Sequence, residues 1–253
     1  MIACAALVAC LLAPAWTGAS TVRPPVSLIA SPSHVALAGA ARQTIKVTNS
    51  GREAVVIDVA RAGFALDLRG RPRIVPGRRQ AWLTVRPLRL AIGPGVTAPL
   101  VVTSKPPLRA EPGDHGALVL LTTRARRNAG LAVQVRLGVV VVIRVPGKIV
   151  RRLDLRGLHV RRRGRARALE ILIANRGNVT ETVGRGCVTV SLRRNGRVLA
   201  RLSPAPRPLL PRTSGIAEVR YGGPVRGWVS ARVDVLAHRP CAQGRRRVFR
   251  IRL

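Results

Sequence analysis

Three kinds of residue are scarce in this 253-residue chain: aromatics, acids and lysines. Aromatic residues make up 2%, which is low for a protein that stacks rings on bases or sugars. Ten Asp and Glu face 45 Lys and Arg, which gives a formal net charge of +35. Only three of these cations are lysines, an arginine bias typical of a GC-rich genome. The hydrophobic share of 47% excludes a disordered basic tail, because a core can form.

The shortage of acids predicts an anionic partner. So many cations repel one another in a compact chain, and exchanging their counterions for a polyanion would lower the free energy. Nucleic acid, anionic lipid and anionic cell-wall polymers all have this chemistry. The scarcity of aromatics argues against nucleic acid, and so does the export signal that the N-terminus suggests.

Residues 1–19 suggest export. The stretch from Ile2 to Trp16 is apolar and uncharged, and Thr17-Gly18-Ala19 offers small residues for cleavage. A basic region before the apolar run is missing. Two alternatives stay open: a lipoprotein processing box at Leu7-Val8-Ala9-Cys10, and an N-terminal membrane anchor, for which the run is short. We expect a secreted or cell-envelope protein.

Cysteine is rare, and the four cysteines divide into two groups. Cys4 and Cys10 would leave with a cleaved signal, and Cys187 and Cys241 would remain. Two cysteines in an exported chain are usually paired. The bridge would close a loop of roughly 55 residues and stabilise the fold by about 4 kcal/mol. The four histidines are too scattered for a metal site, so we expect neither metal nor cofactor.

The remaining chain has the pattern of strands and turns, with no helical stripe. Residues 131–145 are the clearest case, because every odd position is apolar while Gln134, Arg136 and Arg144 occupy even ones. A period of two predicts a strand that buries one face continuously, as in a sandwich core. The apolar positions that form a candidate strand-pairing edge are Leu131, Val133, Val135, Leu137, Val139, Val141 and Ile143.

A domain boundary is expected at Pro146-Gly147-Lys148. The turns Asn49-Ser50-Gly51 and Asn175-Arg176-Gly177 lie 126 residues apart, and each follows an alternating strand. This faint repeat predicts two copies of a sandwich of about 100 residues. The fold class is therefore all-β, with two immunoglobulin-like β-sandwiches in tandem, at residues 26–147 and 148–253, after a signal peptide at 1–19.

The sequence lacks the motifs of common enzymes. It has no GxSxG, Walker loop, GxGxxG after a strand, or HExxH. Asp67-Leu68-Arg69-Gly70 and Asp154-Leu155-Arg156-Gly157 are the same tetrapeptide and predict turns in which Asp accepts backbone donors. The carboxylates are scattered, so we expect no catalytic activity.

An arginine run at 151–167 is the best candidate for binding a polyanion. If it forms one strand, Arg161, Arg163, Arg165 and Arg167 share a face, and arginine suits bidentate contacts with phosphate or carboxylate. A solvated face in an arginine-biased chain is the competing interpretation. The candidate residues are Arg151, Arg152, Arg161, Arg162, Arg163, Arg165 and Arg167.

The order of strands and turns over residues 26–147 carries a family resemblance. Ser31-Pro32-Ser33 opens it, Trp82-Leu83-Thr84-Val85 and Pro112-Gly113-Asp114-His115 follow, and Pro146-Gly147 closes a long strand. This resembles the peptidoglycan-binding domain of the WxL-interacting cell-surface proteins of Gram-positive bacteria, here of an actinobacterial type. The resemblance implies binding to an anionic wall polymer or a surface protein, with membrane contact only through an N-terminal anchor. That family's C-terminal transmembrane helix has no counterpart in this sequence.

The same layout also resembles the periplasmic pilus chaperones. These proteins pair two sandwiches and place an alternating strand before the link between the domains, as residues 131–145 do. This alternative implies a protein that donates or caps a β-strand of a secreted subunit.

Overall fold

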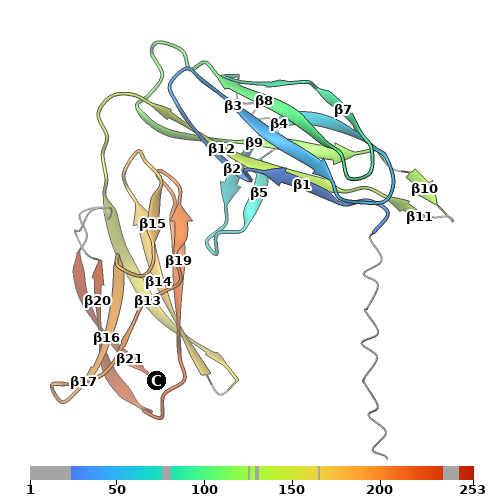
Figure 1. The fold of residues 1–253 in the computed structure, drawn as a ribbon. Helices are drawn as coiled ribbons and strands as arrows, with labels where there is room; N and C mark the ends of the chain where they lie inside the picture. Colours follow the sequence, from blue (N-terminus) through green and yellow to red (C-terminus); the bar gives the residue numbers. More distant parts are fainter. Residues whose placement is uncertain (1–23, 76–80, 125, 129–130, 165, 236–244) are drawn as a thin grey trace, which may run out of the picture.

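The computed structural model describes residues 24–253 except 76–80, 125, 129–130, 165 and 236–244. Its described residues contain strands and no helices, and they form two immunoglobulin-like β-sandwiches (Figure 1). Every strand pairing joins strands on the same side of Pro146-Gly147-Lys148. The all-β fold class with two sandwiches is therefore confirmed.

The first sandwich packs a sheet of order β1-β3-β8-β6 against one of order β2-β12-β9-β4-β5, in which β7 also pairs with β4. Ile45 and Val47 of β3 are fully buried, as their alternation predicts, and they pack in one core with Leu121 and Ile143. The strands are β1 (Leu28–Ser31), β2 (His34–Ala38), β3 (Ala41–Asn49), β4 (Val55–Leu66), β5 (Pro72–Val75), β6 (Leu83–Arg86), β7 (Arg89–Ile92), β8 (Thr97–Ser104), β9 (Gly113–Thr123), β10 (Arg126–Asn128), β11 (Leu131–Val133) and β12 (Arg136–Val145).

The second sandwich packs a sheet of order β13-β14-β19 against one of order β17-β16-β20-β21, and β15 pairs with β18. Leu169, Ile171 and Leu192 are fully buried between the sheets. The strands are β13 (Leu153–Arg163), β14 (Ala166–Asn175), β15 (Glu181–Val183), β16 (Val188–Arg194), β17 (Arg197–Leu202), β18 (Arg207–Leu209), β19 (Ser214–Tyr221), β20 (Trp228–Val235) and β21 (Arg246–Arg252).

The two Asn-x-Gly turns perform the same structural task in the two sandwiches. Asn49 is fully buried, and its amide donates to the carbonyls of Glu53 (2.7 Å) and Ile92 (3.2 Å). Asn175 makes the equivalent bonds in the second sandwich, at 2.8 and 3.1 Å. A Cβ on Gly51 or Gly177 would lie 2.6 or 2.3 Å from an earlier backbone carbonyl, so glycine is required at both positions. The repeat is therefore a property of the fold.

Residues 131–145 do not form one uninterrupted strand. Gln134 and Val135 separate β11 from β12, and the odd side chains are fully buried only from Val139 to Ile143. Val133 is 49% exposed, and Val135 and Leu137 are half-buried. The expectation of a continuously buried face is thus wrong for the first part of the segment, because the core of the first sandwich extends only as far as Leu137.

The arginine run is a hairpin, which corrects the expectation of one strand with an arginine face. Chain reversal at Gly164, with φ +56°, places Arg162 of β13 opposite Arg167 of β14. The second Asp-Leu-Arg-Gly tetrapeptide lies inside β13, where it forms a β-bulge between Leu155 and Gly157, so the expected turn is wrong there. The first tetrapeptide does form a turn, and Asp67 accepts the N–H groups of Arg69 and Arg71.

The expected signal peptide at 1–19 and Cys241 lie outside the described residues. Within the described part of the chain, nothing forms a helix with the length and apolarity that crossing a bilayer requires.

Candidate strand-pairing edge and interdomain cleft

Strand β12 has one covered edge and one edge that is only partly covered. β9 pairs with it along its whole length, from Arg136 to Val145. On the other side, β2 runs parallel to it and pairs only with Val140–Arg144. Among the described residues, no strand pairs with the preceding part of this edge, residues 136–139. β11 likewise pairs only with β10, at the end of the first sandwich away from the second (Figure 1).

The hydrogen bonds between β9 and β12 show which way the N–H and C=O groups of β12 point. Thr123 donates to the carbonyl of Val135 (2.9 Å), and residues 137 and 139 continue the pairs that bond to β9. The N–H of Val140 points the other way and donates to Ser33 (3.1 Å). Because neighbouring residues in a strand alternate, the N–H and C=O groups of Arg136 and Gly138 face the uncovered edge.

The predicted edge positions fall into two groups: those paired with β2 and those that precede this pairing. Val141 and Ile143 lie opposite Val35 and Leu37 of β2, so that part is already paired. Val133, Val135 and Leu137 precede it, with apolar side chains that the sandwich does not fully cover. The side chain of Leu131 lies outside the described residues, and its backbone belongs to β11.

An apolar cavity of about 310 Å³ opens beside Val133. Val26, Val55 and Ile92 line it at the end of the first sandwich, and Arg124 lies at its wall. Both the uncovered backbone and this cavity therefore lie at the end of the first sandwich where β11 begins.

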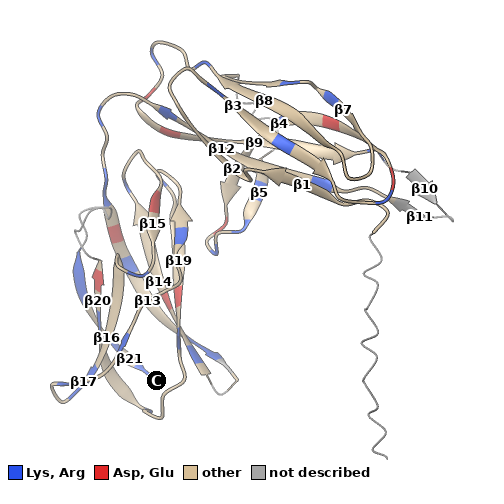
Figure 2. Cartoon of the chain, viewed as in Figure 1, with Lys and Arg blue, Asp and Glu red and all other residues tan. Residues whose placement is uncertain are grey.

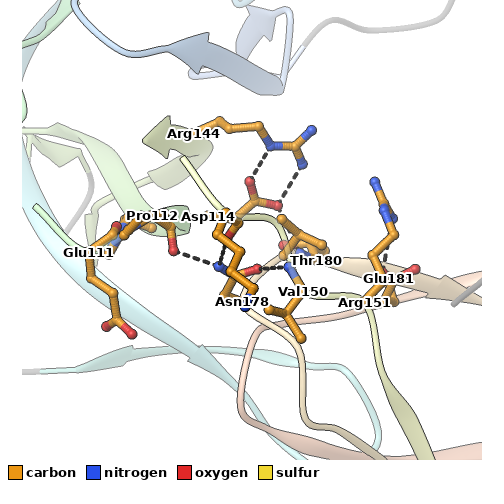
Figure 3. A network of polar contacts seen from close by, with 12 residues as sticks. Glu111, Pro112, Asp114, Arg144, Val150, Arg151, Asn178, Thr180 and Glu181 are labelled. Atoms are coloured by element: carbon orange, nitrogen blue, oxygen red, sulfur yellow. Dashed lines mark hydrogen bonds and ion pairs between the residues drawn. The ribbon is translucent and has the colours of Figure 1, made fainter. Parts of the chain in front are cut away.

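A polar network fixes the second sandwich to the opposite end of the first (Figure 3). Asp114 accepts two hydrogen bonds from Arg144, at 2.7 and 2.9 Å, and one from the N–H of Thr180 at 2.8 Å. Asn178 donates to the carbonyls of Pro112 (2.9 Å) and Lys148 (2.8 Å). These bonds tie β9 and β12 of the first sandwich to the loop before β15 in the second.

Burial and hydrogen bonding compete at Asp114. Burial disfavours its charge, but the hydrogen bonds from Arg144 and Thr180 outweigh burial and hold the pKa of Asp114 below 3.8. Nearby Glu181 is almost fully buried and pairs with Arg151 at 2.9 Å. There burial dominates and raises the pKa of Glu181 above 4.5, although Arg151 opposes the shift.

Gly113 lets the two sandwiches approach this closely. Its φ is +124°, and a Cβ would lie 2.1 Å from the carbonyl oxygen of Asn178. The N–H of Asp114 donates to that same oxygen at 2.8 Å. A larger residue at position 113 would therefore separate the domains locally.

A second contact between the sandwiches comes from the β4–β5 turn. Arg69 pairs with Glu170 of β14 (2.7 Å) and Glu218 of β19 (3.3 Å), which raises the pKa of its guanidinium. The N–H of Ile216 donates to the carbonyl of Leu68 at 2.6 Å. We call this contact the Arg69 latch.

Asp114 and Thr180 of the polar network line a cleft between the two sandwiches. Its cavity measures about 450 Å³, and Phe64 and Val142 of the first sandwich face Leu210 and Pro211 of the second. The sequence does not predict this cleft, because its lining residues are far apart in the chain and of ordinary types. Asp114 and His115 line it, although the sequence marks them only as part of the turn Pro112-Gly113-Asp114-His115.

Among the predicted polyanion residues whose side chains the structure describes, three form ion pairs with carboxylates of the same sandwich. Arg151 pairs with Glu181, Arg152 with Asp154 (3.5 Å) and Arg161 with Glu170 (3.7 Å). Burial, and then the nearby Arg226 and Arg162, lower the pKa of Arg167. The side chain of Arg163, and Arg165 as a whole, lie outside the described residues.

Cys187 is disulfide-bonded. Its expected partner, Cys241, lies outside the described residues, so the pairing of these two cysteines stays a prediction. In the described ranges no group of three or more His, Cys, Asp or Glu side chains could hold a metal ion.

Among the solved structures similar to this chain are several fimbrial chaperones. The class 5 fimbriae chaperone CfaA is 12% identical, with 88% of this chain and 98% of that chain covered and a TM-score of 0.48. For the CupB2 chaperone of Pseudomonas aeruginosa the identity is 15%, the coverage 89% and 100%, and the TM-score 0.44. For the E. coli chaperone DraB these values are 11%, 90% and 99%, and 0.45. No protein-family model and no curated protein matches the chain.

These findings correct the resemblance to the WxL-interacting proteins, because no family model matches and the similar structures are fimbrial chaperones. The residues that carried the resemblance are structural parts of the sandwich: Ser31 ends β1, Leu83–Val85 belong to β6, and Pro146-Gly147 follow β12. Binding to peptidoglycan or another wall polymer, the partner expected with that family, is not supported. At such low identity the likeness extends to the fold, and evidence for function has to come from the chain's own geometry.

Proposed function

We propose that this chain is a non-catalytic, exported, chaperone-like protein that pairs the uncovered edge of β11 and β12 with a strand of a secreted partner subunit. Fimbrial chaperones among the similar solved structures are in complex with a tip adhesin or a pilin. The proposed partner is a subunit of that class, whose strand the edge completes or caps.

One observation carries the proposal: the apolar alternation continues beyond the point where the chain buries it. Val133, Val135 and Leu137 keep the pattern of the buried Val139 and Val141, yet they are partly exposed. The N–H and C=O groups of Arg136 and Gly138 face the same open edge. An added strand satisfies the backbone groups by hydrogen bonds, while its side chains cover the apolar ones.

The location of the protein is supported by a separate feature. A disulfide at Cys187 persists in oxidising compartments, and reduction in the cytosol would remove it. This agrees with the export that residues 1–19 predict.

Two substitutions at one position test the proposal. Gly138→Pro removes the N–H that faces the open edge and leaves the ladder to β9 intact, so the sandwich should tolerate it as edge strands do. Gly138→Ala keeps this N–H, and the added Cβ meets only ordinary contacts, 3.7 Å from Leu118 and 3.9 Å from Leu120. Each variant is expressed with a tag in the native host, and the proteins recovered with it are identified.

We expect the Gly138→Ala variant to recover as much of a secreted subunit as the unsubstituted chain does. The Gly138→Pro variant should recover much less of that subunit, although its own circular-dichroism spectrum and melting temperature stay unchanged. Equal recovery by both variants would show that the partner binds elsewhere. If the unsubstituted chain recovers no secreted protein from cells that export it, the chaperone-like function is wrong.

A further inference from the structure

The outer face of the second sandwich's four-stranded sheet is strongly basic. The register places residues of β17, β16, β20 and β21 in rows across it, such as Arg201–Ser191–Arg232–Val248 and Val198–Arg193–Ser230–Arg250. Same-face neighbours lie roughly 5 Å apart across strands and 7 Å along them. The arginines of this surface, which we call the basic face, are Arg193, Arg201, Arg232, Arg246, Arg250 and Arg252.

Acids are distributed unequally between the two sheets of this sandwich (Figure 2). Among the described residues, Asp234 is the one carboxylate on the basic face, and it pairs with Arg232 (3.0 Å) and Arg246 (2.7 Å). The other sheet carries Asp154, Glu170 and Glu218, all in ion pairs. Arg232 and Arg246 share Asp234, and in the described part of this sheet the basic face thus keeps Arg193, Arg201, Arg250 and Arg252 without a carboxylate of their own sheet beside them.

Three apolar side chains stand among these arginines, and one of them, Val198, is 41% exposed. Trp228 is 55% exposed and Val248 63% exposed. The guanidinium of Arg250 lies 4.9 Å from the centre of the Trp228 ring, in a cation–π arrangement. A shallow groove of about 260 Å³ continues the face across Ser191, Arg193 and Arg201.

The arrangement favours a lipid surface over a protein. A stable protein interface has an apolar core surrounded by a polar rim. On the basic face the apolar side chains are isolated, and Arg250 separates Trp228 from Val248. At a membrane surface no such core is needed: arginines contact phosphates, while tryptophan and short apolar side chains enter the interfacial layer.

We propose that the basic face binds the surface of membranes containing anionic phospholipids, with its arginines on the headgroup phosphates and Trp228 in the interfacial layer. This binding is peripheral and independent of the strand-pairing edge, which belongs to the other sandwich. It would hold the chain at the membrane from which secreted proteins emerge.

Co-sedimentation with vesicles tests the proposal. The purified chain is mixed with phosphatidylcholine vesicles that contain roughly one third phosphatidylglycerol, the source of negative charge, or none. We expect binding to the anionic vesicles and little to the neutral ones. The triple variant Arg193→Gln/Arg201→Gln/Arg250→Gln should bind about a hundredfold more weakly, since each arginine near an anionic surface contributes about fivefold.

The matched control removes the same charge from the first sandwich. Arg42, Arg86 and Arg109 are exposed there, and their replacement by Gln should weaken binding by less than about fivefold. An equal loss in both triple variants would show that the overall charge binds the vesicles, which overturns a dedicated face. Melting temperatures of both variants confirm that they are folded.

Tryptophan fluorescence gives a second readout. Trp228 should shift to shorter wavelength on anionic vesicles, and Trp228→Phe should abolish the shift while most binding remains. Binding without a shift would overturn the proposed contact. A different outcome would show that the basic face is a protein docking site and that the lipid proposal is wrong. In that outcome the chain does not bind vesicles but binds an acidic protein, and the basic-face triple variant loses this protein binding.

Discussion

At the scale of single residues, stability depends on a few buried polar side chains. Asn49, Asn175 and Asp114 are each buried, and each satisfies several backbone or side-chain groups that water cannot reach. Loss of one partner leaves the others buried without hydrogen bonds, which costs more than the bond itself contributed. These residues should therefore be far more sensitive to substitution than the many surface arginines.

Asn49→Ala should lower the free energy of unfolding by about 3 kcal/mol, because carbonyls of Glu53 and Ile92 and the N–H of Gly51 lose their partner. Arg52→Ala, on the exposed side of the same turn, should change it by less than about 0.5 kcal/mol. Urea unfolding measures both. Similar midpoints for the two variants would contradict this role of Asn49.

Asp114→Asn should cost about 2 kcal/mol at neutral pH, since Arg144 loses its charged partner while remaining half exposed. The pKa of Asp114 is lowered by folding, so its stabilisation is complete above the unfolded value near 3.8 and is lost as the pH falls through the lower folded value. The difference between the two proteins should thus hold from pH 7 to pH 5 and shrink below 3.8.

Denaturant unfolding along this pH series measures that difference. Glu181 contributes oppositely, because its raised pKa favours the folded state at lower pH. The Asp114 charge is one cause of that shift, so both proteins are compared in a Glu181→Gln background, which removes this contribution. A difference that does not change with pH would show that the Asp114 charge is not the stabilising feature.

At the scale of elements, strand identity could be predicted from the sequence better than strand limits. The alternation in β3 and the Asn-x-Gly turns after β3 and β14 were correct, because these signals are local. The break after Val133 and the hairpin at Gly164 were missed. The break after Val133 depends on how far the core of the first sandwich extends, which the local sequence does not show. The hairpin at Gly164 was missed because its flanking arginines are compatible with a strand as well as with a turn.

The candidate site was predictable to the same degree. The apolar alternation marked the strand-pairing edge, but only the position of β2 shows where that edge is uncovered. The interdomain cleft could not be foreseen: Asp114 and Arg144 are cross-strand partners of β9 and β12, but Thr180 reaches them only when the second sandwich is placed.

The neighbouring antiparallel strands β4 and β9 yield an element-scale prediction. A Cβ at Gly116 would lie 2.6 Å from the ring edge of Phe64, which forms part of the cleft. Gly116→Ala should therefore destabilise the chain by about 1 kcal/mol, because the ring must move. In a Phe64→Ala background the same change should cost almost nothing. A double-mutant cycle by thermal unfolding measures this coupling, and additive effects would contradict it.

At the scale of the whole molecule, two contacts set the angle between the sandwiches. The Asp114 network and the Arg69 latch join different strands of each, so together they restrict rotation in a way that one contact cannot. A fixed angle keeps the cleft at one width and leaves the strand-pairing edge at the far end exposed to a partner.

Arg69→Gln should broaden the range of interdomain distances with little loss of stability, since the arginine is partly exposed. Small-angle scattering measures the distance distribution. Arg89→Gln removes a comparable ion pair with Asp58 inside the first sandwich and should leave that distribution unchanged. Equal distributions for Arg69→Gln and the unsubstituted chain would mean that the latch does not hold the angle.

Amide hydrogen exchange of β12, in the chain alone and with the recovered subunit bound, tests the central claim most directly. The N–H groups of Arg136 and Gly138 face the uncovered edge, whereas those of Leu137 and Val139 already bond to β9. The account predicts that binding slows exchange at Arg136 and Gly138 by at least about tenfold and changes Leu137 and Val139 little. Unchanged exchange at Gly138 in a chain saturated with the subunit would contradict it.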